Sequence, residues 1–497
     1  MIKLTSRTLF LVAAIITFEG CTRHPGLFSS HLSSKQLSRE LDVLFSSPSF
    51  SNAHWGVVVK SLKNDQILYQ RNANKGFIPA SNLKILTTAA ALNFLGPQFR
   101  FCTSLYYKGI ITDRSVLDGD LILRGGGDPT LNDSKHLVAI ADSLHAMGVV
   151  SISGRIVGDD NHYEDENLGA GWEWDDLSDD YAAQISALSL NDNCVKIDFT
   201  PGILFGDLST FSLHPPTDYV SVQNRVTTVE SDSRIILKRP MGSNWVMCSG
   251  VIDHQVKKHR ERFTVDNPTR YAVHVLREVL LSRHIDVAGA AFDIDDLADY
   301  SYSMTPDRIV ARFQSPELSR IVTIINKESQ NLYSELVMRE LGKRCGKGGT
   351  AAAGIAVAKN WIIGMGIDTV SAVIADGSGL SRRNLLTPMC LVDILQLVRQ
   401  QSDHNIFFNS LPIAGIDGTL ENRMNGTAAH GKIHAKTGTL GAVKALSGYA
   451  TTLDGEELAF SIIANNFTVS GNLADRIQDT ACQLLAGFSR KRASGGV

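Results

Sequence analysis

The sequence lacks any marked excess of charge. It contains 48 lysine and arginine residues against 51 aspartate and glutamate residues, which gives a formal net charge of −3 over 497 residues. A chain so nearly neutral has no overall field that would attract nucleic acid or an anionic membrane. We therefore expect no nucleic-acid partner, and any basic site must be local.

Metal-binding and thiol-redox motifs are also missing from the sequence. Seven cysteines are present, but no two of them form a C-x-x-C pair, and H-E-x-x-H does not occur. We expect chemistry without a metal or other cofactor. The six cysteines that follow Cys21 could form disulfides in an oxidising compartment, but sequence alone does not determine their pairing.

The first residues have the layout of an export signal. Lys3 and Arg7 precede an apolar run over residues 9–18, which is too short to span a bilayer. This pattern predicts a secretory signal over residues 1–21 and an exported, periplasmic or envelope location. No later segment reaches membrane-spanning length, so we expect no transmembrane helix.

The end of this signal leaves two alternatives open. Gly20-Cys21 is typical of a lipoprotein signal, in which Cys21 would carry a lipid anchor. Phe18 and Glu19 are poor residues for that kind of cleavage site, and ordinary cleavage is the alternative.

The order of expected elements indicates one domain interrupted by an insertion. Helical and strand-like segments occur at both ends of the chain, whereas the middle consists mostly of short strand-like pieces. We predict an α+β multidomain protein whose main domain, an antiparallel sheet flanked by helices, is split by a large, mostly β insertion. The predicted boundaries are 35–102 and 301–488 for the split domain and 103–300 for the insertion, divided into 103–160 with 265–300 and a nested 161–264.

Three short motifs carry the expected chemistry. They are Ser81-Asn-Leu-Lys84, Ser329-Gln-Asn331 and Lys436-Thr-Gly438, in that chain order. Ser81 is the only serine followed by lysine three places later, and the Lys-Thr-Gly triplet occurs once. Together they predict a serine acyl-transfer site.

The spacing of the first motif suits a nucleophile and its base. Residues three apart on a helix lie on one face, so the Lys84 amine reaches the Ser81 hydroxyl. Serine needs a neighbouring base to become a nucleophile, and an ordinary lysine with a pKa near 10.4 would be charged. We expect burial and a second cation, Lys436, to keep the Lys84 amine neutral.

The other motif residues have expected roles in the same reaction. Ser81 is expected to begin a helix, so that its own N–H, together with that of Thr439, could stabilise an oxyanion. Gly438 would let substrate backbone lie against the strand. Ser329 would relay protons, Asn331 would hold a substrate carbonyl, and Thr437 or Thr439 would supply hydroxyl donors beside Lys436.

With these motifs, the chain resembles the low-molecular-mass class C penicillin-binding proteins, the D-alanyl-D-alanine carboxypeptidase/endopeptidase family of the penicillin-binding protein 4 type. Further matching stretches are PASNLK, GDLILRGGGDPTL, GWEWDDL, SALSLN, DGSGLSRRN and AKTGTLGAVKALSGY. The resemblance covers about residues 35–485. It implies cleavage of D-alanyl bonds in peptidoglycan stem peptides and covalent inhibition by β-lactams. It also implies a substrate pocket lined by Asp176, Tyr181 and Arg382.

Several alternatives stay open at this point. A β-lactamase could use the same site, and a non-enzymatic peptidoglycan-binding protein could retain the fold. Carboxypeptidase and endopeptidase cleavage break the same bond, and the oligomeric state is not determined. Gly441 stands where the resemblance implies a polar side chain after the Lys-Thr-Gly motif, so one substrate contact is expected to be missing. His434 is expected to lie on the same strand face as Lys436 without a role. Gly125–Gly127 are expected to form a structural turn, not a phosphate-binding loop.

Overall fold

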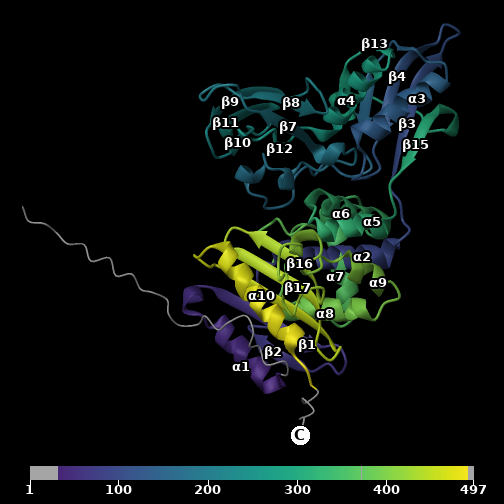
Figure 1. Cartoon of the computed structure of the whole chain (residues 1–497). Helices are drawn as coiled ribbons and strands as arrows, with labels where there is room; N and C mark the ends of the chain where they lie inside the picture. Colours follow the sequence, from purple (N-terminus) through teal and green to yellow (C-terminus); the bar gives the residue numbers. More distant parts are fainter. Residues whose placement is uncertain (1–31, 371, 491–497) are drawn as a thin grey trace, which may run out of the picture.

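The computed structural model describes residues 32–370 and 372–490. The predicted signal, including Cys21, lies outside the described residues. Among the helices of the described part, none is long and apolar enough to cross a membrane. One region is built around a five-stranded sheet, and a second region, made from the middle of the chain, extends away from it (Figure 1).

The five-stranded sheet joins the two ends of the chain. All its neighbouring strands are antiparallel, and β1 pairs with β18 from His54 opposite Asn465 to Ser61 opposite Leu458. In sheet order the strands are β16 (Ile433–Leu440), β17 (Val443–Thr451), β18 (Glu457–Asn465), β1 (His54–Ser61) and β2 (Ile67–Arg71). β16, which carries the Lys-Thr-Gly motif, is therefore an edge strand.

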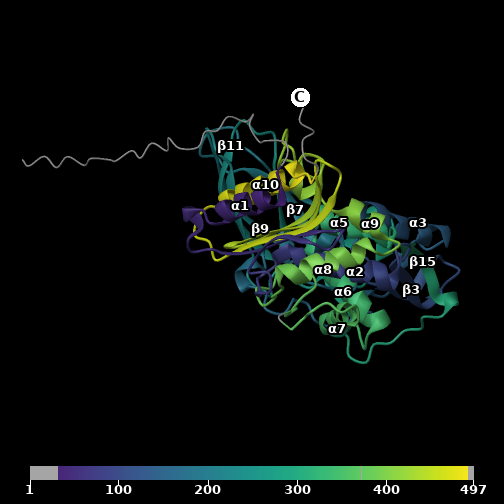
Figure 2. The same cartoon turned by 90° about the horizontal axis from the view of Figure 1, so that it is seen from below.

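Helices cover both faces of this sheet, because its central strands bury both sets of alternating side chains. In β18, Phe460 and Ile462 belong to the core beneath α1 (Ser34–Phe45) and α10 (Gly471–Gly487). Ala459 and Ile463 belong to the core beneath the other helices, on the opposite face (Figure 2). Those helices are α2 (Lys84–Leu95), α5 (Leu318–Lys327), α6 (Asn331–Cys345), α7 (Ala351–Gly364), α8 (Pro388–Arg399) and α9 (His404–Ser410). The predicted arrangement of an antiparallel sheet flanked by helices is confirmed.

The middle region contains three further sheets and two α-helices, α3 (Val138–Ala146) and α4 (Pro268–Ser282). The seven-stranded sheet comprises β3 (Cys102–Ile111), β4 (Val116–Arg124), β5 (Ser151–Ile152), β6 (Ile156–Asp159), β13 (Asp286–Val287), β14 (Ala291–Asp293) and β15 (Ile309–Gln314). The two three-stranded sheets comprise β7 (Cys194–Thr200), β8 (Thr210–His214) and β12 (His259–Thr264), and β9 (Ser221–Val229), β10 (Arg234–Lys238) and β11 (Trp245–Asp253).

The strand pairing moves one predicted boundary. β15 pairs with β3, with Gln314 opposite Cys102, so residues 309–314 belong to the sheet of the middle region. The chain returns to the helices just afterwards, where Ser315 N donates to Phe101 O. The second part of the split domain therefore begins after Gln314, whereas the sequence placed it at residue 301. Short strand-like segments between two regions give no periodic signal for which sheet they join.

The Gly125–Gly127 turn lies against a neighbouring chain segment. Gly125 N donates to Asp159 O and Gly127 N donates to Ala187 O. A Cβ on Gly126 would lie 2.0 Å from Cys102 O, so only glycine permits this approach. These contacts give the glycines a structural role. The six cysteines among the described residues, from Cys102 to Cys482, are all free.

The crossing of α6 and α7 depends on a glycine. A Cβ on Gly354 would lie 1.8 Å from Met338 O, so the α7 backbone touches the α6 backbone at this point. α6 begins with Asn331 of the second motif. The close contact therefore helps to fix the position of a motif residue.

We expect Gly354→Ala to lower the free energy of unfolding by about 1–3 kcal/mol, the usual cost of overpacking. Gly364→Ala, at the end of the same helix, is the control, because its Cβ would meet no atom within 4 Å. That change should leave stability equal or up to about 1 kcal/mol higher, through helix propensity. Denaturant unfolding of both variants measures the difference, and equal stabilities would contradict the assigned contact.

Candidate active site

Ser81 and Lys84 face each other at the start of α2. Ser81 lies inside a short 3-10 helix, Ala80–Leu83, and Lys84 is the first residue of α2. Lys84 Nζ lies 2.8 Å from Ser81 Oγ. The expectation that Ser81 begins the helix is wrong in detail: the 3-10 turn starts from Ala80, at a φ of +46°, and the α-helix starts at Lys84.

Two glycines let other segments approach this strained turn. A Cβ on Gly379 would lie 2.0 Å from Ala80 O, and one on Gly438 would lie 2.9 Å from Pro79 O. Asn82 Nδ2 also donates to Lys436 O, which ties the turn to β16. Two distant parts of the sequence, the loop with Gly379 and the strand β16, thus hold the Ser81 turn in place.

The Lys84 amine is fully buried and has three acceptors. It donates to Ser81 Oγ, to Asn331 Oδ1 at 2.6 Å and to Ser378 O at 2.7 Å. Burial lowers the pKa of Lys84 from 10.5 to about 7, although the negative charges of Asp376 and Glu335 act in the opposite direction. An amine with this pKa is substantially neutral at neutral pH, as a general base must be.

Lys436 supplies a second buried amine from β16. Its Nζ donates to Ser329 Oγ at 2.9 Å and to Thr437 O at 3.1 Å. Burial, and then the positive charge of Lys84, lower the pKa of Lys436 well below its usual value. Burial is thus the main cause for both lysines, and the predicted repulsion between them acts on the pKa of Lys436.

The second motif lies where the chain turns into α6. Ser329 has a φ of +62°, a conformation that aims its hydroxyl at Lys436 Nζ. Asn331 accepts from Lys84 through Oδ1 and donates through Nδ2 to Tyr181 O at 2.7 Å. Both ends of the Asn331 amide are therefore held.

A cavity of about 780 Å³ opens above the two lysines. All the predicted site residues except Lys84 and Lys436 line it: Ser81, Ser329, Asn331, Thr437, Gly438, Thr439, Asp176, Tyr181 and Arg382. Both lysines are buried beneath it. The structure therefore brings together residues that are spread over more than 350 positions.

The residues predicted for substrate contact form one wall of this cavity. Tyr181 OH donates to Asp176 Oδ1 at 2.8 Å and to Asp179 Oδ2 at 2.9 Å. Arg382 pairs with Glu173, at 3.2 Å between Nε and Oε1, and donates to Gly441 O at 2.8 Å. Gly441 thus contributes its carbonyl to the wall. This wall offers both carboxylates and a guanidinium to a ligand.

His434 lies outside the cavity lining. Its ring stacks on Phe408 with 4.0 Å between centroids, and burial lowers the pKa of its imidazole. That His434 has no role in the reaction stays a prediction.

Sequence reasoning missed two buried carboxylates behind the lysines. Glu335 Oε1 accepts the N–H groups of Gly377 and Ser378, each at 2.9 Å, and Ser378 O in turn accepts from Lys84. Asp376 accepts from Gly379 N at 2.8 Å and Ser381 N at 2.7 Å. Glu335 lies one helical turn after Asn331, and that spacing is the one signal that could have identified it.

Comparisons with known proteins agree with this geometry. Residues 37–487 match the family of D-Ala-D-Ala carboxypeptidase 3 (S13). A D-alanyl-D-alanine carboxypeptidase of Actinomadura sp. (strain R39) is 33% identical over 474 residues, covering 93% of this chain and 86% of that protein. A D-alanyl-D-alanine carboxypeptidase of Haemophilus influenzae is 26% identical over 455 residues, covering 88% and 93%.

Solved structures show the same fold. The crystal structure of penicillin binding protein 4 from Haemophilus influenzae superposes with a TM-score of 0.76 at 24% identity, covering 91% of this chain and 98% of that one. A structure of that protein complexed with a β-lactam gives a TM-score of 0.72. The chain belongs to the S13 family of D-Ala-D-Ala carboxypeptidases.

We expect the pH dependence of activity to follow Lys84. Its pKa near 7 means that the neutral amine increases as the pH rises through 7. Release of D-alanine from a D-alanyl-D-alanine peptide should therefore rise about tenfold per pH unit below this value and level off above it. Measurement of kcat/KM between pH 5 and 8 tests this, and a flat profile would exclude Lys84 as the base.

Glu335 is expected to act as a positioning residue. Glu335→Gln removes a negative charge that raises the pKa of Lys84, so the apparent pKa of kcat/KM should shift to lower pH, with at least a tenfold loss of kcat. Glu340→Gln is the control, because this buried acid on the same helix pairs with His162 and Arg344 instead. It should lower stability without moving the pH profile. If Glu335→Gln leaves the pH profile where it is in the wild type, the assignment of Glu335 is contradicted.

Proposed function

We propose that this S13-family enzyme is an exported DD-peptidase that cleaves D-alanyl peptide bonds of peptidoglycan through an acyl-enzyme on Ser81. The observation that carries the proposal is the 2.8 Å contact between Ser81 Oγ and a buried Lys84 amine whose pKa is near 7. Serine acylation needs a base with this pKa at this distance.

In the acylation step, Ser81 Oγ bonds to the carbonyl carbon of the D-alanyl residue while Lys84 Nζ takes the hydroxyl proton. The N–H groups of Ser81 and Thr439 would stabilise the negative charge on the carbonyl oxygen. Asn331 would hold the substrate carbonyl while its amide stays fixed between Lys84 and Tyr181. These N–H donors would lower the energy of the transition state because they are already in place before the negative charge develops on the carbonyl oxygen.

The leaving group then needs a proton. The C–N bond breaks, and Ser329 Oγ, held by Lys436 Nζ, would donate its proton to the leaving amine and take up the proton that Lys84 accepted from Ser81, so that Lys84 is neutral again. The product is an ester on Ser81 and a free amine. Water hydrolyses the ester, with Lys84 again accepting a proton, and the peptide is released.

Substrate binding would use the edge strand and the cavity wall. β16 has a free edge beside Gly438, where an extended peptide can add as a further strand. Lys436 and the hydroxyls of Thr437 and Thr439 would receive the carboxylate of the substrate. Asp176, Tyr181 and Arg382 would bind the polar end of the stem-peptide side chain, because they present opposite charges within one wall.

Both carboxypeptidase and endopeptidase activity belong to the proposal. The two reactions share the acyl-enzyme and differ only in the leaving amine, which is free D-alanine or a cross-linked residue. A cavity of about 780 Å³ that is open toward the edge strand has room for the larger leaving group. β-Lactams would acylate Ser81 by the same attack, and the β-lactam complex of the Haemophilus influenzae protein supports this.

Location at the cell envelope completes the proposal. The leader with Lys3, Arg7 and an apolar run supports export, and Cys21 would be the point of attachment if the mature protein is lipid-anchored.

A fluorescent penicillin should label the wild-type protein covalently and leave Ser81→Ala unlabelled. Purified protein should also release D-alanine from a monomeric pentapeptide muropeptide and split a D-alanyl cross-linked dimer. Ser81→Ala should lose both activities by at least about 1,000-fold, the scale on which loss of a catalytic nucleophile acts.

Thr427→Ala, a change in a surface turn, serves as the control for labelling. Equal labelling of wild type and Ser81→Ala would refute the nucleophile. Release of D-alanine without cleavage of the dimer would refute the endopeptidase part alone.

A further inference from the structure

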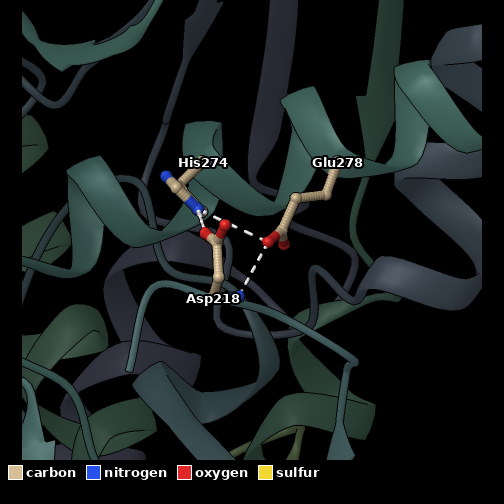
Figure 3. A group of neighbouring side chains, drawn as sticks. All are labelled: Asp218, His274 and Glu278. Carbon is tan, nitrogen blue, oxygen red and sulfur yellow. Dashed lines mark hydrogen bonds and ion pairs between the residues drawn. The ribbon is translucent and has the colours of Figure 1, made fainter. Parts of the chain in front are cut away.

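Three potential metal ligands meet in the inserted region, far from Ser81 in the fold. His274 and Glu278 lie one turn apart on α4, and Asp218 lies in the turn between β8 and β9 (Figure 3). His274 Nε2 lies 2.5 Å from Asp218 Oδ1 and 3.4 Å from Glu278 Oε1. The three donor atoms all lie within 4.8 Å of one another.

The surroundings hold these side chains in place. The Asp218 N–H donates to Glu278 Oε1 at 2.9 Å, so the turn is fastened to the helix. The Tyr219 ring packs against the His274 ring with 5.3 Å between centroids, and Tyr219 OH donates to Asp266 O and Asn267 O. The imidazole is thereby oriented by a side chain that is itself anchored.

The cluster carries uncompensated negative charge. Two carboxylates face one imidazole, and the structure records no lysine or arginine paired with either acid among the described residues. Glu278 Oε2 is buried without a hydrogen-bond partner. The basic neighbours on α4 are engaged elsewhere: Arg270 approaches Asp296, and Arg277 donates to Gly289 O and Val287 O. A divalent cation would neutralise both acids, whereas a proton on His274 neutralises one.

The donor set favours a borderline transition metal. An imidazole nitrogen with two carboxylate oxygens suits zinc, whereas magnesium and calcium prefer oxygen donors alone. Metal–ligand distances near 2.1 Å in a tetrahedral site place donor atoms about 3.4 Å apart, which small side-chain shifts reach from the present separations. The Asp218 side chain is 87% exposed, so a metal has an entry path and water can complete the coordination.

We propose that Asp218, His274 and Glu278 form a zinc-binding site in the inserted region. The site is separate from the peptidase chemistry and departs from the expectation that the chain needs no metal. Sequence spacing did not reveal it, because Asp218 lies 56 residues before His274. Zinc bound here would join α4 of the seven-stranded-sheet unit to the turn that leads into β9, and so would fix the two parts of the insertion together.

The test is isothermal titration of the full metal-free chain with zinc chloride, followed by thermal unfolding with and without zinc. Wild type should bind one zinc ion per chain at this site and unfold at a higher temperature when it is present. His274→Ala should weaken binding by at least about tenfold, since loss of a mere supporting partner already costs that much. Calcium chloride should not compete.

His259→Ala is the matched control, because this imidazole contacts the single carboxylate Glu261 at 2.8 Å in the same region. It should bind zinc as wild type does. If His274→Ala does not fold, the near-isosteric Glu278→Gln decides the question by the same titration. The proposal would be overturned if the wild type did not bind zinc, or if both His274→Ala and Glu278→Gln bound zinc as tightly as the wild type does. His274 would then serve only as an ion-pair partner.

Discussion

The active site depends on keeping two lysine amines out of water. Transfer of an ammonium group into a protein interior is so costly that the group gives up its proton unless opposite charge compensates it. Here Glu335 and Asp376 lie behind the lysines and supply part of that compensation. The balance leaves Lys84 with a pKa of about 7. The same contacts tie the helices, the edge strand and the Gly377–Gly379 loop into one network.

The inserted region contributes directly to this network. The Tyr181 carbonyl fixes the Asn331 amide, and Trp172 Nε1 donates to Asp376 Oδ2 at 3.1 Å. Both residues come from the irregular segment between β6 and β7. Asn331, a predicted catalytic residue of the split domain, is therefore oriented by a segment of the insertion. The insertion completes the cavity wall as well as extending the molecule.

The sequence was sufficient to predict the motifs and the split fold, because each motif has a fixed spacing and the ends of the chain have strong periodic patterns. Lys84 could be predicted as the base from its spacing to Ser81, but the predicted effect of Lys436 on the pKa of Lys84 could not be checked from the sequence, and in the structure burial is the main cause. The buried acids could not be predicted, because Glu335 looks like any polar residue on a helix until its two N–H donors are known. The 3-10 turn at Ser81 was also out of reach, because the left-handed Ala80 depends on the close approach of Gly379. The cluster of Asp218, His274 and Glu278 could not be predicted either, because Asp218 lies 56 positions before His274 and the residues meet only in the folded chain.

The pairing of β1 with β18 has a consequence for biogenesis. His54 and Asn465 are opposite one another in the sheet, although more than 400 residues separate them in the chain. Closing a loop of this length is slow, and the sheet cannot form until nearly the whole polypeptide has emerged. During synthesis Ser81 exists without Lys436, which follows it by more than 350 positions. The cavity that Ser81 and the Lys-Thr-Gly strand share can therefore be completed only after β16 has been synthesised.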